Sequence, residues 1–301
     1  MIMEQTRDWE LAEALGIKTS LRPPPVWQHR IDLGHFKDDP IKTYERELEW
    51  TVLRANSQEI CQKLSQAPPR FTFLSALVVK LIIRFALVDV LAYLEQNQPE
   101  LFMVGFDGPI LPLNASAYYP QISVLNYWRD SSWFKRNRTY IPEAMDHASA
   151  NGHVEVLDWW LREAELPLKY SEAALEQASG HNHLAVLEWW RLAATIDERV
   201  VLRPGRVPTI ASRWGHVGIL ELWRQLKGDE KIVCEEDALV QATIHQYIDV
   251  LEWWKQFAHG KLPEALEDSM GKDNDKVRQW WVNNGLNLGL MNMEWILTRS
   301  L

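Results

Sequence analysis

The sequence has few of the features that mark secreted, membrane-spanning or nucleic-acid-binding proteins. It holds only two cysteines in 301 residues, Cys61 and Cys234, so a disulfide framework is not expected and a reducing compartment is favoured. The first residues include Asp8 and Glu10 and contain no apolar segment typical of a signal peptide. We therefore expect an intracellular protein, either cytoplasmic or nuclear.

Long uninterrupted apolar runs are also missing. The most apolar stretch, residues 71–93, contains Lys80, Arg84 and Asp89, and each of these charges would be costly at the centre of a bilayer. We expect no membrane span there. We predict instead two buried helices with a break near Arg84.

Positive charge is scarce relative to negative charge. The net charge is −9, which argues against nucleic-acid binding, because such binding depends on lysine and arginine side chains at the phosphates. The chain also lacks a glycine-rich phosphate loop, a His-Glu-x-x-His motif and a Gly-x-Ser-x-Gly motif. We therefore predict a protein without catalytic residues, cofactors or bound metal ions.

The most informative feature of the chain is a repeated phrase. Residues 148–160, Ala-Ser-Ala-Asn-Gly-His-Val-Glu-Val-Leu-Asp-Trp-Trp, return in related form at residues 178–190, 211–223, 242–254 and 269–281. The valine or isoleucine at the same place in each phrase recurs every 27 to 34 residues, from Val90 to Val277. Periods of this length indicate stacked copies of one supersecondary unit.

Each repeat is predicted to contain two helices. The first is short and begins with proline, serine or acidic residues, which suit the unpaired amides and the positive end of a helix start. These starts are expected at Pro142, Ser171, Val207, Glu235 and Pro263. The second helix carries the tryptophans, and its apolar residues recur at i, i+3 and i+4, which gives it a wide apolar face.

The phrase small-x-x-Gly-His-x-x-Val-Leu-x-Trp-Trp resembles the second helix of ankyrin repeats. It is similar to the divergent, tryptophan-rich ankyrin-like repeats found in long fungal and protist proteins. Gly152-His153 and Gly215-His216 match the turn between the helices, and Asn182-His183 approximates it. The resemblance implies an all-α, helix-pair repeat solenoid of about six to seven units, with helical caps at both ends. The usual Thr-Pro-Leu-His opening is missing, so the hairpin fingers of ordinary ankyrin repeats are not expected.

Four regions are predicted along the chain. They are an N-terminal arm with capping helices (1–70), a degenerate first repeat (71–111), ankyrin-like repeats (112–282) and a C-terminal cap (283–301). Within the first region, residues 43–65 are predicted as one long amphipathic helix that ends at Pro68-Pro69.

The tryptophan pairs 159–160, 189–190, 253–254 and 280–281 are interpreted as core, because ankyrin repeats carry buried leucines at the matching positions. The alternative is an aromatic ladder that stacks bases or peptide side chains. Base stacking is disfavoured by the acids next to the rings, which are Asp158, Glu188, Glu221 and Glu252. The recurring His153, His183 and His216 are interpreted as turn residues that donate to a neighbouring backbone carbonyl, and not as metal ligands.

The first helices are rich in acidic residues. In ankyrin-type stacks these helices line the concave side, so we predict an acidic groove that receives a basic peptide or protein surface. The candidate binding residues are Glu143, Asp146, Glu172, Glu176, Glu235, Glu236, Glu264 and Glu267. The alternative interpretation of these acids is ordinary solvation and helix-start preference.

The sequence thus predicts a non-catalytic scaffold for protein–protein interaction, with a protein partner and no nucleic acid or membrane. Two alternatives remain open. One is a structural subunit of a larger assembly, held by the arm at residues 1–43. The other is an enzyme with an unrecognised site between repeats, which a deep pocket lined by convergent polar groups would indicate.

Overall fold

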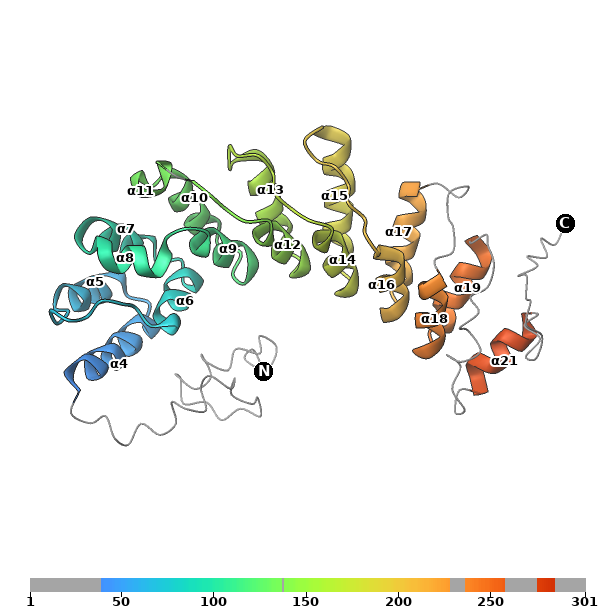
Figure 1. Cartoon of the computed structure of the whole chain (residues 1–301), viewed down its shortest axis with the longest axis horizontal. Coiled ribbons are helices and arrows are strands. Elements are labelled where there is room, and N and C mark those ends of the chain that lie inside the picture. The colour runs from blue at the N-terminus through green and yellow to red at the C-terminus, as the bar shows by residue number, and fades with distance from the viewer. Residues whose placement is uncertain (1–38, 137, 228–235, 258–274, 285–301) are drawn as a thin grey trace. The chain divides into compact units, whose positions relative to one another are not determined.

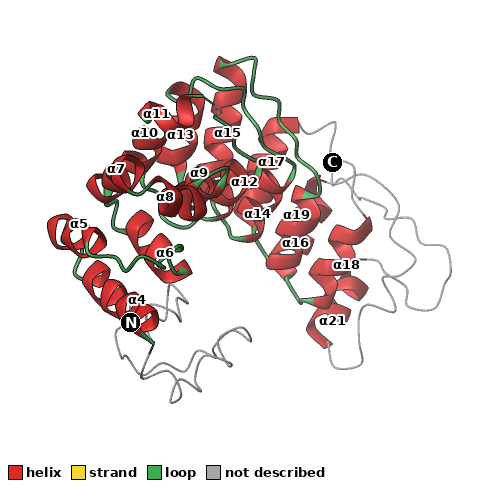
Figure 2. Cartoon of the chain, turned by 60° about the vertical axis from the view of Figure 1, so that its left-hand side comes forward, coloured by secondary structure: helices red, strands yellow, loops and turns green. Residues whose placement is uncertain are grey.

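The computed structural model describes residues 39–136, 138–227, 236–257 and 275–284. Every regular element in these residues is an α-helix, so the predicted all-α class is confirmed for them (Figures 1 and 2). The chain divides into two compact units, residues 1–141 and 142–301. None of the described helices is both long and apolar enough to cross a bilayer. Most of the predicted N-terminal arm and C-terminal cap lies outside the described residues.

The first unit consists of helices joined by short turns. Its elements are α4 (Pro40–Leu53), α5 (Ser57–Ser65), α6 (Ala76–Arg84), α7 (Val88–Asn97), α8 (Pro99–Phe106), α9 (Ile110–Ala117), α10 (Ile122–Asp130) and α11 (Ser132–Lys135). The predicted break near Arg84 is confirmed, since α6 ends at that residue and Ala86 takes a left-handed conformation with φ of 51°. Helix α4 packs on α5 and α6, and α5 packs on α7.

The prediction of one helix over residues 43–65 is wrong. The chain forms α4 and α5 instead, and between them Ala55 has a φ of 54°. The Asn56 side chain accepts hydrogen bonds from the amides of Gln58 and Glu59 at 3.1 and 3.3 Å, which starts a new helix. An asparagine followed three residues later by a glutamate is a helix-start signal that was present in the sequence.

A single carboxylate joins three helices of the first unit. Glu95 of α7 accepts hydrogen bonds from the Tyr127 hydroxyl of α10 at 2.5 Å, from the hydroxyls of Ser131 and Ser132, and from the amide of Trp133. Partial burial alone would raise the pKa of Glu95, but these four donors hold the pKa below its ordinary value. Burial, together with the hydrogen bond to Glu95, raises the pKa of Tyr127. Glu95 therefore fixes the start of α11 against α7 and α10.

The second unit consists of consecutive helix pairs. Its elements are α12 (Glu143–Ala150), α13 (Val154–Arg162), α14 (Ala173–Gly180), α15 (Leu184–Ile196), α16 (Val207–Trp214), α17 (Val217–Lys227), α18 (Glu236–Ile244), α19 (Ile248–Phe257) and α21 (Asp275–Asn283). The first helices α12, α14, α16 and α18 pack on one another in sequence. The second helices α13, α15, α17 and α19 form a neighbouring row (Figure 1).

The turn inside each pair has one geometry in four copies. The residue before the second helix donates its amide to the alanine carbonyl five residues earlier, as from His153 to Ala148 at 2.9 Å. The residue preceding it is left-handed in every copy, with φ between 60° and 81° at Gly152, Asn182, Gly215 and Gln246. Glycine and asparagine adopt this conformation most readily, which explains why the sequence favours them there.

The predicted starts of the first helices agree with the structure to within two residues at α12, α14, α16 and α18. Ser171 accepts from the amide of Ala173 at 3.1 Å, as expected of a helix cap. The start predicted at Pro263 lies outside the described residues.

Candidate functional site

The second tryptophan of each pair is core, as predicted. Trp160, Trp190, Trp254 and Trp281 are at most 1% exposed. The indole N–H groups of the last three find partners on the first helix of the preceding pair. Trp190 donates to the Ser149 hydroxyl at 3.1 Å, Trp254 to Ser212 at 2.8 Å, and Trp281 to Thr243 at 3.2 Å. Trp190, Trp254 and Trp281 therefore each join two neighbouring pairs by packing and by one hydrogen bond.

The first tryptophan of each pair is also packed. Trp159, Trp253 and Trp280 are buried and Trp189 is half-buried. Each first ring meets the second ring of its pair edge to face, with centroids 4.8–5.1 Å apart. This geometry is favourable for aromatic rings.

The acids next to the rings have a specific role that the sequence did not reveal. Trp189 donates its indole N–H to Asp158 at 3.4 Å, Trp253 to Glu221 at 3.3 Å, and Trp280 to Glu252 at 2.5 Å. In each case the acid belongs to the second helix of the preceding pair. We call these three pairs the indole–carboxylate contacts. They join successive second helices along the surface of the row.

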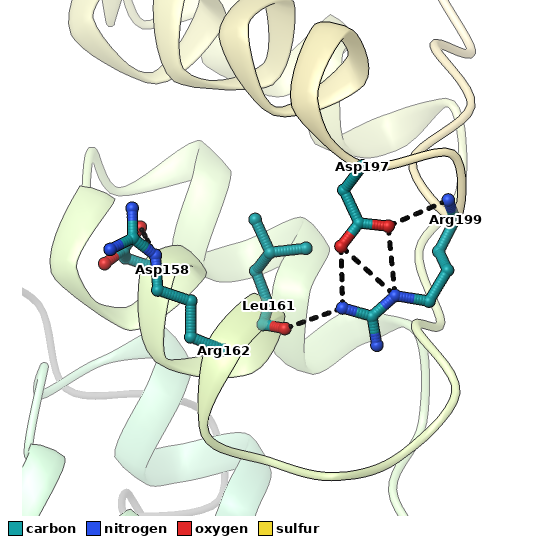
Figure 3. A network of polar contacts seen from close by, with 5 residues as sticks. All are labelled: Asp158, Leu161, Arg162, Asp197 and Arg199. Carbon is teal, nitrogen blue, oxygen red and sulfur yellow. Dashed lines mark hydrogen bonds and ion pairs between the residues drawn. The ribbon is translucent and has the colours of Figure 1, made fainter.

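Arginines hold some of these carboxylates from the same helix. Figure 3 shows Arg162 directed toward Asp158, with Nε 3.1 Å from Oδ1.

Arg199, in the loop after α15, binds Asp197 at 2.7 Å and donates to the Leu161 carbonyl at 3.0 Å. Arg199 also holds the pKa of Asp197 below its ordinary value. The loop is thereby tied to the last turn of α13.

One interface in the row lacks its indole–carboxylate contact. Between α15 and α17 the carboxylate is Glu188, but the position of the first tryptophan is occupied by Leu222, which has no N–H donor in its side chain. Gly218 replaces the larger Glu155 and Asp249 of the other pairs. A Cβ at Gly218 would lie 3.3 Å from Leu184 Cδ1, so the glycine lets Leu184 pack closely against α17.

A groove lies at this place, which we call the α15–α17 groove. Its volume is about 430 Å³. It is shallow and mostly apolar. It is lined by Leu184, Ala185 and Glu188 from α15 and by Gly218, Glu221, Leu222 and Gln225 from α17.

The predicted acidic binding residues have different environments. Asp146 is only 4% exposed and accepts hydrogen bonds from the Ser171 amide at 2.8 Å and hydroxyl at 2.6 Å. Burial raises the pKa of Asp146 and the bonds from Ser171 oppose this. Glu176 is half-buried and accepts from the Arg206 amide at 2.7 Å. Both side chains therefore join neighbouring helix pairs.

Glu143 and Glu172 remain exposed at the starts of α12 and α14. The backbone of Glu236 begins α18, but its side chain lies outside the described part of the structure. Glu235, Glu264 and Glu267 also lie outside it. Of the predicted binding acids, the structure thus shows two that are exposed on the first-helix row, and the predicted acidic groove stays a prediction.

The turn histidines behave as predicted where their contacts are described. His216 Nε2 lies 3.1 Å from the Gly180 carbonyl, and His183 is hydrogen-bonded to the backbone of Ala150. Burial, with His181 6.0 Å away between ring centroids, lowers the pKa of His183. Within the described ranges no group of three histidine, cysteine or acidic side chains is placed to hold a metal ion.

Comparison of the chain with protein-family models, curated proteins and solved structures gives no match.

Proposed function

We propose that the helix pairs of this chain form an ankyrin-like repeat solenoid, and that the solenoid is a non-catalytic scaffold for protein binding. The recurrence of one turn geometry, one hydroxyl–indole bond and one carboxylate–indole bond from pair to pair supports the repeat assignment. Each such unit contacts mainly its neighbours, which is how repeat proteins build extended binding surfaces.

The main support for the proposal is that buried polar side chains of the helix pairs form hydrogen bonds to a neighbouring pair. The buried Asp146, Ser149 and Ser212 are each bonded to a residue of a neighbouring pair. The repeated residues thus account for the fold.

We propose that a basic protein surface binds the first-helix row, with Glu143 and Glu172 as its described contacts. Both side chains are exposed, and the net charge of the chain is −9. Opposite charges on a partner would steer association and make it sensitive to salt.

The test is retention of the chain on an array of lysine- and arginine-rich peptides. The double variant Glu143→Lys with Glu172→Lys should lose retention, and retention of the unaltered chain should fall as salt rises. The matched control is Glu155→Lys with Glu198→Lys, which makes the same change in net charge at exposed positions away from the first helices. Equal retention of the two double variants would contradict binding at the first-helix row.

A further inference from the structure

The α15–α17 groove lies where the other interfaces hold an indole ring. Trp189, Trp253 and Trp280 each extend from one second helix to the carboxylate of the preceding one. At the α15–α17 interface, Leu222 stands in that position and Glu188 is the carboxylate. The groove is therefore a place for an indole that this pair of helices does not supply.

Glu188 retains the geometry of a carboxylate that accepts an indole. Arg191 binds it from three residues further along α15, through Nε at 2.8 Å and through Nη2. Arg224 binds Glu221 from the same relative position, and Glu221 still accepts the N–H of Trp253 at 3.3 Å. A carboxylate that is paired with an arginine at i+3 can thus accept a further hydrogen bond, because each of its oxygens carries two lone pairs.

The walls of the groove suit a flat apolar ring. Leu184 is 42% exposed at its edge, and Ala185 and Leu222 add apolar surface. Gly218 lines the groove without adding a side chain to it. The volume of about 430 Å³ lies within the ~300–1,000 Å³ range of small-ligand sites.

Electrostatics favour a neutral donor in this groove. Glu188 is paired with Arg191, and the second lining carboxylate, Glu221, is paired with Arg224. A lysine or arginine from a partner would approach both of these cations. An indole N–H brings a hydrogen-bond donor without a charge, as Trp253 already does at the next interface.

We propose that the α15–α17 groove binds a tryptophan side chain of a partner protein, with its indole N–H donated to Glu188. This assignment rests on the proposed protein-binding function and adds a second surface, on the second-helix row. The bound ring would complete the series of indole–carboxylate contacts from outside the chain.

The probe is N-acetyltryptophanamide, and its binding to the full chain is measured by saturation-transfer NMR titration. The comparison probe is the 1-methyl derivative, which keeps the ring and carries a methyl group in place of the N–H hydrogen. We expect the methylated probe to bind about tenfold more weakly, because hydrogen bonds to charged acceptors are stronger than neutral ones. Equal affinities would overturn the role given to Glu188.

Three variants locate the binding. Leu222→Trp should abolish it, because the new ring fills the groove. The matched control Leu192→Trp places the same change at an exposed leucine of α15 outside the groove and should leave affinity unchanged. Glu188→Gln keeps the shape and should weaken the N-acetyltryptophanamide complex while leaving the methylated probe unaffected. Unchanged binding to a folded Leu222→Trp variant would overturn the proposal.

One more variant separates a partner's tryptophan from the chain's own. Trp9, Trp27 and Trp295 lie outside the described residues. If replacing all three by alanine strengthens probe binding, one of them competes for the groove and the assignment to a partner is overturned. Unchanged binding supports a partner. Failure of these probes would leave the basic-peptide array result intact, so the two proposals fail independently.

Discussion

Two successive interfaces of the second-helix row differ in one contact. Between α17 and α19, Trp253 is 6% exposed and donates to Glu221. Between α15 and α17, Leu222 occupies the matching position, Leu184 is 42% exposed, and a groove of about 430 Å³ remains. Both carboxylates carry an arginine at i+3, so the difference lies in the indole and in Gly218, which stands where α19 has Asp249. The two interfaces therefore differ in whether an indole fills the space beside the carboxylate.

The largest expected effect comes from the core that both interfaces share. Trp254→Ala removes a ring with no exposed surface and leaves Ser212 without its indole partner. We expect a loss of about 3–5 kcal/mol in the free energy of unfolding, as for other buried tryptophans. Chemical denaturation measures it. Trp214→Ala, at a ring that is 54% exposed, is the control and should change stability by no more than about 0.5 kcal/mol.

A smaller effect should follow when the α17–α19 interface is made to resemble the α15–α17 interface. Trp253→Leu removes the ring that packs on Trp254 and the donor to Glu221. We expect a loss of about 1–3 kcal/mol by chemical denaturation, because the neighbouring helices close the gap only in part. A stability equal to that of the unaltered chain would show that the contact is incidental.

The reverse change should fill the groove at the α15–α17 interface. Leu222→Trp places an indole in the α15–α17 groove within reach of Glu188. Filling a surface cavity with a matched side chain commonly gains about 0.5–2 kcal/mol, and thermal and chemical denaturation would both register it. Leu192→Trp should give no such gain. A destabilised Leu222→Trp variant would mean that the groove does not have the shape of an indole.

The smallest expected effect is the pH dependence of stability that arises from the pKa of Glu221. Arg224, with a contribution from Trp253, lowers the pKa of Glu221 from 4.5 to about 2. Glu221 therefore stabilises the fold above its unfolded pKa, and this contribution is lost as pH falls from about 4.5 toward about 2. Its side chain is 37% exposed, so solvent screening keeps the effect on stability small.

Carboxyl-carbon NMR can read this titration directly. In the Trp253→Leu variant the pKa of Glu221 should rise, because one hydrogen-bond donor to the charged form is lost. Glu188 serves as the internal reference, since Arg191 lowers its pKa without help from an indole. If the pKa of Glu221 were the same in the variant as in the unaltered chain, the Trp253 indole would not contribute to lowering that pKa.

The sequence predicted more of the fold than of the surface. The helical period placed the second tryptophans in the core, and the proline, serine and acidic residues located the starts of the first helices. The break between α4 and α5 was missed, although Asn56 and Glu59 carried a helix-start signal. Among the predicted binding acids, Asp146 proved to be buried against Ser171.

The sequence by itself determined that the chain is helical, that it repeats, and which face of each helix is apolar. Helical periodicity follows from residues three and four apart, which the sequence lists side by side. Only the tertiary structure decided that the acids beside the tryptophans accept indole N–H groups, and that the contact is missing at Leu222. Those partners lie about thirty residues apart, as from Glu221 to Trp253, so their meeting depends on how whole helices pack.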